Sequence, residues 1–251
     1  MLKSLTVILT VIAIILPGCS SDNDKKIDSS KLRQTIVQAI TGDYDANVKL
    51  QGMISPKQIG KSEYNQLTID SFRIDKRSYY SVILEYPDPK LNLFAIYDED
   101  LNLYLLDKSL NGNLSDEWVQ MGIHNFVFVQ ERFLSKDVLS LDRLSIYEVK
   151  NKSANLIYRS LSRFVEGKEI AYQTVESLTK DLILTKMTGL EDKSLDNQTD
   201  TFYFNANYNR YFSKWNLFNN YVKQKIKEFN WVVIKPEIPA DLFEDNDKGN
   251  K

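Results

Sequence analysis

Most of the chain alternates between apolar and polar residues with a period of two, which is the pattern of β-strands with one buried face. The segments are rich in Tyr, Phe, Ile, Leu and Val, and polar turns separate them. Strands are expected in a first series at residues 46–54, 64–74, 79–86, 91–97 and 101–106, and in a second series at 125–133, 144–149, 155–164, 168–177, 182–188 and 201–207. Because no helical crossovers separate the segments, they predict antiparallel meanders.

Apolar residues at helical spacing lie on either side of these strands. Ser30 to Ile40 predicts one amphipathic helix, with an apolar face of Leu32, Ile36, Val37 and Ile40. Near the other end, Ser213 can cap a helix with a stripe of Leu217, Phe218, Tyr221, Val222, Ile226 and Phe229. We therefore expect an α+β fold, mainly an antiparallel meander with an N-terminal and a C-terminal amphipathic helix packed on it.

The expected domain covers residues 31–240. Residues 109–121 are less regular than their surroundings, so the domain is either one unit or two halves that meet near residues 109–124. Residues 231–234 can add a short strand, and the acidic residues 241–251 are expected to form a disordered tail.

The first residues have the order of a secretory signal peptide. Lys3 precedes an apolar run from Leu5 to Leu16, and Pro17 and Gly18 follow it. The run is shorter than the roughly 20 apolar residues that a transmembrane helix needs to cross the hydrocarbon core. Residues 1–18 are therefore expected to direct export.

Leu16-Pro17-Gly18-Cys19 resembles the lipobox of bacterial lipoproteins, in which a branched apolar residue and a small residue precede the cysteine that receives diacylglycerol. Pro17 is an uncommon residue at its position, whereas Leu16, Gly18 and Cys19 fit the pattern. The resemblance implies lipidation of Cys19 with two or three acyl chains, including palmitate-like chains, and an effectively permanent membrane anchor. The alternative is a buried structural cysteine.

Residues 19–30 are polar and are expected to form a flexible tether. Ser20 stands where aspartate would retain a lipoprotein in the inner membrane, so the resemblance favours the outer membrane of the cell envelope. The acidic stretch at residues 21–24 is also similar to the surface-export tethers of Bacteroidetes lipoproteins. Both the periplasmic and the surface face remain open.

Residues 144–229 resemble the PsbP-like and DcrB-like group. They contain hairpins with a Gly-Lys turn, here Glu166-Gly167-Lys168, followed by a closing amphipathic helix. The resemblance covers about a third of the chain and rests on the order of these elements. Because this group is largely non-enzymatic, exported and often lipid-anchored, the resemblance implies a function in assembly or binding.

Composition excludes several classes of site. One cysteine and one histidine exclude intrachain disulfides, thiolate zinc sites and multi-histidine metal centres, so we expect no metal or other cofactor. The 32 basic and 34 acidic residues are interleaved and give a net charge of −2, so no basic surface for nucleic acid is expected.

Two motifs resemble the sites of nucleophilic enzymes but lack their context. Ser177-Leu178-Thr179-Lys180 matches the Ser-x-x-Lys motif of penicillin-recognising enzymes, but it lies at the end of a strand pattern. Of its companion motifs, Ser-Asp-Asn occurs only in the tether, at residues 21–23, and Lys-Thr-Gly is interrupted at residues 186–189. His124 has no Gly-x-Ser-x-Gly elbow to serve, so we expect a hydrogen-bonded loop histidine. The sequence therefore predicts no catalytic residue.

Acidic residues suggest two further sites. Asp98, Asp100 and Asn102 alternate as calcium ligands do, but Leu103 and Ser109 replace the glycine and the glutamate of such loops, which favours a polar hairpin turn. Asp116 and Glu117 are one candidate pair for the catalytic acid and base of a glycosidase. Because the chain has 34 acidic residues, the choice of this pair is arbitrary.

Aromatic residues offer the remaining candidate surface. They include Tyr79, Tyr80, Phe202, Tyr203, Phe204, Tyr208, Tyr211 and Phe212. Most are expected in strands and core, and some can form a binding face. We expect a non-enzymatic, membrane-anchored envelope lipoprotein that binds a partner protein or ligand. The alternatives are a carrier or sensor of a small apolar or glycan ligand with a deep aromatic-lined cavity, and a hydrolase that uses carboxylates alone.

Overall fold

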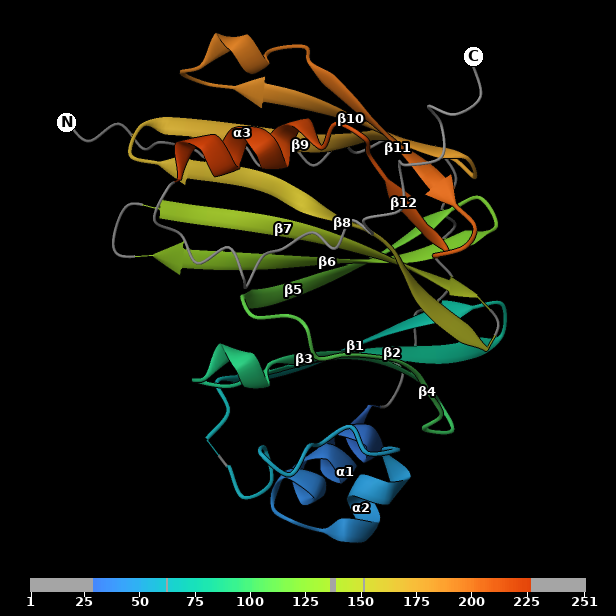
Figure 1. Cartoon of the computed structure of the whole chain (residues 1–251). Coiled ribbons are helices and arrows are strands. Elements are labelled where there is room, and N and C mark those ends of the chain that lie inside the picture. The colour runs from blue at the N-terminus through green and yellow to red at the C-terminus, as the bar shows by residue number, and fades with distance from the viewer. Residues whose placement is uncertain (1–28, 62, 136–138, 151, 227–251) are drawn as a thin grey trace, which may run out of the picture.

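The computed structural model describes residues 29–61, 63–135, 139–150 and 152–226, and Figure 1 shows their arrangement. Most of these residues lie in two antiparallel sheets, and few lie in helices. The smaller sheet has the order β1 (Gln66–Ile74), β2 (Arg77–Glu85), β3 (Leu93–Asp98) and β4 (Leu103–Asp107). The larger sheet runs in chain order through β5 (Asn113–Met121), β6 (His124–Ser135), β7 (Leu139–Lys150), β8 (Ser153–Glu166), β9 (Glu169–Leu178), β10 (Leu182–Gly189), β11 (Thr199–Asn205) and β12 (Arg210–Phe212). The expected antiparallel meanders are confirmed.

The smaller sheet is covered on both faces, which explains why nearly every residue of β2 and β3 is buried. Helices α1 (Ser30–Ile40) and α2 (Tyr44–Lys49) lie on one face, and strands of the larger sheet lie on the other (Figure 1). Alternate residues of β2 point to the two sides, so Tyr80 packs with the helices and Tyr79 packs with the larger sheet. Both tyrosines are therefore core residues.

Helix α1 has the predicted bounds, Ser30–Ile40. Leu32, Ile36 and Ile40 are buried as expected, whereas Val37 is 37% exposed and does not belong to the buried face. Ala39 is also buried and completes the face of the helix that packs on the sheet. The helical pattern thus correctly located the element and misjudged one residue of its face.

The strand expected at residues 46–54 is wrong, because these residues begin within helix α2. The Asp43 carboxylate accepts a hydrogen bond from the Ala46 backbone N–H at 3.0 Å and caps the helix. Asp45 in the first turn and Lys49 in the last turn complement the helix dipole. The apolar residues that suggested a strand, Leu50, Met53 and Ile54, are instead buried in the core after the helix ends.

Strand β8 changes direction along its length, and this opens the larger sheet. Relative to β7 it carries extra residues at two register shifts, which bend a strand. β8 pairs with β9 only over Arg163–Glu166, and its first half contacts β12 instead. Figure 1 shows β8 sweeping away from β9 towards the smaller sheet. The sheet therefore curls, and a space opens between β8 and the strands that follow.

Two strands were not predicted. β5 (Asn113–Met121) is an edge strand in the passage expected to be irregular, and only Leu114 of its residues is fully buried. Its Trp118 ring stacks on Phe72 of the smaller sheet, with ring centroids 3.5 Å apart. β12 has three residues, too few to show a period. The chain passes from the smaller to the larger sheet between Asp107 and Asn113.

Helix α3 (Leu217–Lys225) is shorter than the predicted stripe, and Ile226 follows it. The Ser213 hydroxyl accepts hydrogen bonds from the backbone N–H groups of Trp215 and Asn216, so it shapes the turn before the helix. The first helical N–H, of Leu217, donates to the Asp200 carboxylate at 2.8 Å. Phe218 and Val222 pack on the larger sheet as expected.

Several predictions lie outside the described residues. They are the signal peptide at residues 1–18, Cys19, the acidic tether, Phe229, the strand at residues 231–234 and the acidic tail. Among the residues that the structure describes, no helix is long and apolar enough to span a membrane. The anchor therefore remains a prediction from the sequence.

Candidate functional site

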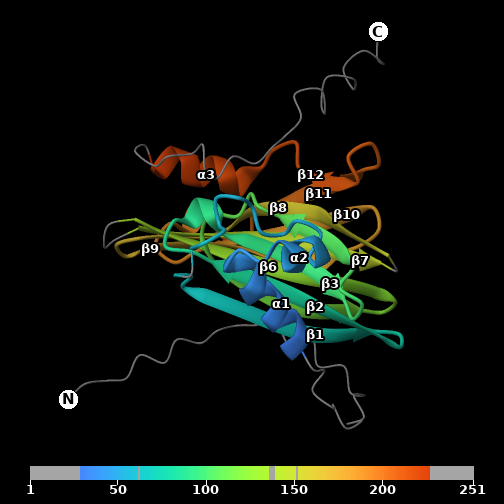
Figure 2. The same cartoon turned by 90° about the horizontal axis from the view of Figure 1, so that it is seen from below.

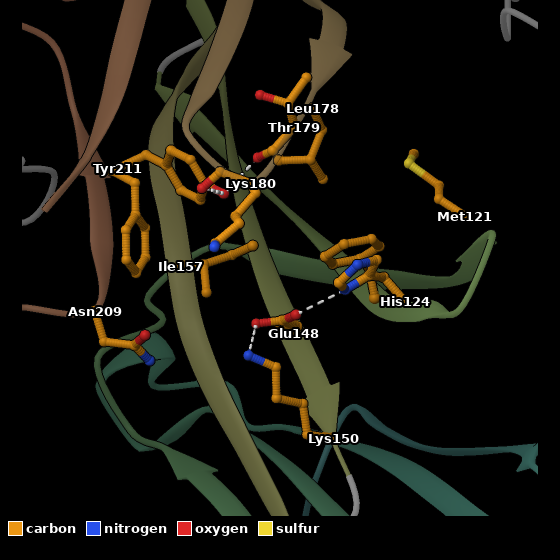
Figure 3. A pocket seen from close by; sticks show the side chains of 12 residues that line it. Met121, His124, Glu148, Lys150, Ile157, Leu178, Thr179, Lys180, Asn209 and Tyr211 are labelled. Carbon is orange, nitrogen blue, oxygen red and sulfur yellow. Dashed lines mark hydrogen bonds and ion pairs between the residues drawn. The ribbon is translucent and has the colours of Figure 1, made fainter. Parts of the chain in front are cut away.

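Four turns of the larger sheet lie at one end of it, because every second turn of a meander returns to the same end. We call this the turn end. It contains the turns that join β5 to β6, β7 to β8, β9 to β10 and β11 to β12. A cavity of about 440 Å³ opens there, lined by residues from seven of the eight strands and from two of the turns (Figure 3). The curl of the sheet creates this cavity.

One wall of the cavity is apolar. It is formed by Phe126, Ile157, Leu178, Phe204 and Tyr211. The rings of Phe204 and Tyr211 meet edge to face, with centroids 5.1 Å apart. Ile157 is one of the extra residues of β8 and is only 2% exposed. This wall can bury an apolar body of a small ligand.

Tyr211 also fixes the floor of the cavity. Its hydroxyl donates a hydrogen bond to the Thr179 carbonyl at 2.6 Å, which ties β12 to the turn between β9 and β10. Burial raises the pKa of Tyr211, and the nearby carboxylates of Glu148 and Asp181 add to the rise. The hydroxyl therefore stays protonated and keeps donating near neutral pH.

A group of polar side chains borders this apolar wall, and its position follows from strand alternation. His124 and Phe126 of β6 share a face with Glu148 and Lys150 of β7, because Phe126 pairs directly with Glu148. Glu148 Oε1 lies 3.2 Å from His124 Nδ1, and Glu148 Oε2 lies 2.7 Å from Lys150 Nζ (Figure 3). Glu148 is thus placed between one cation and the chain's single histidine.

Lys180 adds a second ammonium group to the cavity. Figure 3 shows its side chain extending from the turn after β9 towards Ile157. In the part of the chain that the structure describes, Lys180 forms no ion pair, whereas Lys150 is paired with Glu148. The lining side chains therefore carry two lysines against one carboxylate, and the unmatched charge is positive. An organic anion would be attracted to it.

Two other depressions of similar size are less suited to an apolar ligand. One, lined by Lys61, Glu63, Pro87 and Asp88 among others, lies beside the loop after β2. The other lies between α1 and the turn after β3, with Gln34, Gln38 and Asp100 in its lining. Charged and polar side chains make up much of both linings, whereas the turn-end cavity has an apolar wall of strand residues.

The motif at residues 177–180 does not form a nucleophilic site. Ser177 lies within β9 and not at the start of a helix. Thr179 Oγ1 donates to the Leu182 carbonyl and accepts hydrogen bonds from the backbone of Asp181 and Leu182, so it is occupied in the turn. Lys180, the last residue of the motif, instead enters the cavity. His124 is hydrogen-bonded as expected, but it is the first residue of β6 and does not lie in a loop.

The residues considered as calcium ligands form a hydrogen-bonded turn. Asp98 Oδ1 accepts from the backbone N–H groups of Asp100 and Asn102, at 3.0 and 2.9 Å. Asp98 Oδ2 accepts from the Asn102 amide and from the Tyr104 hydroxyl. Both carboxylate oxygens are therefore used within the β3–β4 connection. Across the described residues, no group of three His, Cys, Asp or Glu side chains is placed to hold a metal ion.

Asp116 and Glu117 do not converge on one cleft. They are consecutive residues of β5, so their side chains point to opposite faces, and Glu117 is exposed. Burial raises the pKa of Asp116, while a hydrogen bond from Ser81 opposes the rise. Asp116 faces the smaller sheet, and its role there is structural.

The sequence identified part of the cavity lining. Phe204 and Tyr211 belong to the aromatic group considered as a binding face, and they line the cavity. Glu148, Lys150 and Ile157 were missed. The only signal for the first two was a pair of polar residues at alternate positions near the end of a strand, which is also the pattern of a solvent-exposed edge.

A second polar cluster joins the two sheets. Asp107 Oδ2 lies 2.6 Å from Arg159 Nη2 and accepts a hydrogen bond from the Tyr147 hydroxyl at 2.7 Å. Ser109 also donates to Asp107, through both its backbone N–H and its hydroxyl. Because Asp107 ends the smaller sheet and Arg159 lies in the larger one, this cluster fixes the passage between them.

Acid should weaken this cluster. Burial alone would raise the pKa of Asp107, but Arg159 and the hydrogen bonds from Ser109 and Tyr147 lower it to about 2 from an ordinary value of 3.8. A lowered pKa stabilises the fold above the ordinary value, and this contribution is lost as the pH falls from 3.8 to about 2. We expect a loss of about 2 kcal/mol in the free energy of unfolding across that window.

Urea unfolding between pH 5 and pH 2 measures this loss, with Asp107→Asn as the control. The two curves of stability against pH should converge as the pH falls, because only the wild type has this carboxylate to protonate. Curves that stay parallel over the whole range would contradict the assignment.

The turn-end cavity thus combines an apolar wall, a Glu148 carboxylate held between His124 and Lys150, and the ammonium group of Lys180. Comparison of the chain with protein-family models, curated protein sequences and solved structures gives no match. A function must therefore be inferred from the side chains of this cavity.

Proposed function

We propose that this protein is a lipid-anchored envelope protein that binds a small organic anion with an apolar body in the turn-end cavity. The ammonium group of Lys180 carries the proposal, because it extends into an apolar cavity without a carboxylate partner among the described residues. A ligand carboxylate or sulfonate beside Lys180 would supply the missing negative charge. The apolar part of the ligand would lie against Phe126, Ile157 and Leu178.

Binding fits this cavity better than hydrolysis. A carboxylate-dependent hydrolase needs two acidic side chains that converge on the substrate. Glu148 is the one acidic residue in the described lining, and it is engaged by His124 and Lys150. The volume of about 440 Å³ is in the range of small-molecule sites. A glycan is less well matched, because the wall offers few hydrogen-bonding groups to hydroxyls.

The anchor and the location belong to the same proposal. The lipobox resemblance at Leu16-Pro17-Gly18-Cys19 supports lipid on Cys19, and Ser20 supports the outer membrane over the inner one. The resemblance of residues 144–229 to the PsbP-like and DcrB-like group is consistent with a non-enzymatic role. We place the fold in the α+β class, because helices pack on a face of each sheet.

A partner protein is the second candidate ligand. Four exposed apolar side chains lie on α1, α2 and the loop that follows: Val37, Tyr44, Val48 and Ile59. Apolar side chains that remain exposed on a compact domain favour contact with another protein. This surface is separate from the turn end, so the two kinds of binding are distinguishable by mutation.

Calorimetric titration with dodecanoate tests the proposal, using the chain without the signal peptide at residues 1–18 and with Cys19→Ala to prevent lipidation. Dodecanoate has a carboxylate and a single apolar chain, and it is used below its micellar concentration. The control ligand is dodecyltrimethylammonium, which has the same chain and the opposite charge. We expect one dodecanoate per chain and much weaker binding of the cation. Equal affinities for the two, or no saturable binding of dodecanoate, would overturn the proposal.

A further inference from the structure

The turn end exposes apolar side chains from the first and the last hairpin of the larger sheet. Met121 and Ile123 lie at the tip of the β5–β6 hairpin and are 40% and 89% exposed. Phe204 and Tyr208 lie at the β11–β12 hairpin and are 37% and 39% exposed. Met121 and Phe204 also line the cavity, so each of the two hairpins borders it. Single exposed apolar residues are ordinary, whereas a group around one opening marks a contact surface.

Cations accompany these apolar side chains. Lys150 and Lys152 flank the turn between β7 and β8, and Lys180 lies in the turn between β9 and β10. Asp181 is the one acidic residue in the described parts of the four turns, while the Glu148 carboxylate lies farther back in the cavity and is paired. We call the set Met121, Ile123, Phe204, Tyr208, Lys150, Lys152 and Lys180 the rim.

We propose that the rim docks onto the surface of a membrane that contains anionic lipids. Apolar side chains at the tips of hairpins can enter the headgroup region, and neighbouring lysines interact with anionic headgroups at about 1 kcal/mol each. The rim has both features on one end of the molecule. In this orientation the cavity mouth faces the bilayer, from which a single-chain anionic amphiphile can enter.

The exposed apolar residues on α2 lack this charge pattern. There, Asp43 and Asp45 accompany Tyr44 and Val48, and Lys49 is the one cation in the helix. Acidic groups beside the apolar side chains would be repelled by an anionic surface. The charge pattern therefore assigns the membrane contact to the rim and not to α2, and Val48 of α2 provides a matched control position.

Site-specific fluorescence tests the docking. Cys19→Ala leaves the chain without cysteine, so Ile123→Cys introduces a single site for an environment-sensitive label. Val48→Cys, which is also an exposed apolar position, gives the control label. Both proteins, without the signal peptide at residues 1–18, are mixed with vesicles of brominated phosphatidylcholine, with or without phosphatidylglycerol. Quenching of the label by bromine reports its entry into the bilayer.

The proposal predicts strong quenching at position 123 with phosphatidylglycerol, weak quenching without it, and little at position 48. The double change Lys152→Glu and Lys180→Glu should weaken the phosphatidylglycerol-dependent binding about tenfold or more. Lys223→Glu on helix α3 should leave it unchanged. No quenching at position 123, or equal quenching with and without phosphatidylglycerol, would overturn the proposal. Failure here leaves the dodecanoate titration unaffected, because that experiment contains no membrane.

Discussion

Replacing Arg143 with methionine is expected to lower the free energy of unfolding by about 3–5 kcal/mol. Arg143 Nε donates to Glu131 Oε2, and both side chains are almost completely buried, with 5% and 0% exposure. Removing the cation leaves the buried Glu131 carboxylate without its hydrogen-bonded counter-charge, which costs far more than the loss of a surface ion pair. Urea unfolding at neutral pH measures the change.

A second variant separates the buried charge from the packing of the arginine. Glu131→Gln keeps an acceptor for the Asn111 backbone N–H, which donates to Glu131 Oε1 at 2.9 Å. Combined with Arg143→Met, it removes both charges and should recover about 2 kcal/mol relative to Arg143→Met alone. Lys193→Met serves as the surface control, because the Lys193–Asp196 pair is largely exposed. A loss from Lys193→Met as large as that from Arg143→Met would contradict this account.

Replacing Lys180 with glutamate is expected to weaken dodecanoate binding about tenfold or more, since every 1.4 kcal/mol corresponds to about a factor of ten. The change removes the unmatched ammonium group and places a second carboxylate in the cavity, so the ligand anion is repelled. The fold should be unaffected, because the turn is held by Thr179 and by the Tyr211 hydroxyl and not by the lysine side chain. Calorimetric titration measures the affinity.

Two controls distinguish charge at the site from charge on the whole protein. Lys223→Glu makes the same change of charge on helix α3 and should leave the affinity unchanged. Lys180→Met keeps the apolar stem of the side chain and should weaken binding less than glutamate does. Equal effects of Lys180→Glu and Lys223→Glu would mean that dodecanoate responds only to the net charge.

The sequence predicted most of the fold because strand alternation is a local property. Tyr79 and Tyr80 illustrate this, since each is buried on its own face of β2. The pattern failed where a local interaction decided the structure. At residues 46–54 the cap from Asp43 began a helix, and in β5 an edge position allowed polar residues within a strand.

The cavity could not be predicted to the same extent, because it depends on how the larger sheet curls. Ile157 reaches the cavity through a bulge in β8, and the pairing that creates the bulge involves residues distant in sequence. Lys180 was noticed in the Ser-x-x-Lys motif, but its unmatched charge appears only when the turns are assembled around it. The aromatic residues Phe204 and Tyr211 could be predicted as candidates, since their side chains suit a binding face wherever they lie.

The position of bound dodecanoate tests the central claim most directly. Methyl NMR of the Cys19→Ala protein can follow Met121, Ile157 and Leu178 in the cavity, with Ile36 and Met53 in the distant helical core as controls. We predict saturable shifts and intermolecular contacts at the methyl groups of the three cavity residues and none at those of the two control residues. Contacts confined to other parts of the protein, or no contacts at saturating ligand, would contradict the assignment of this cavity as the binding site.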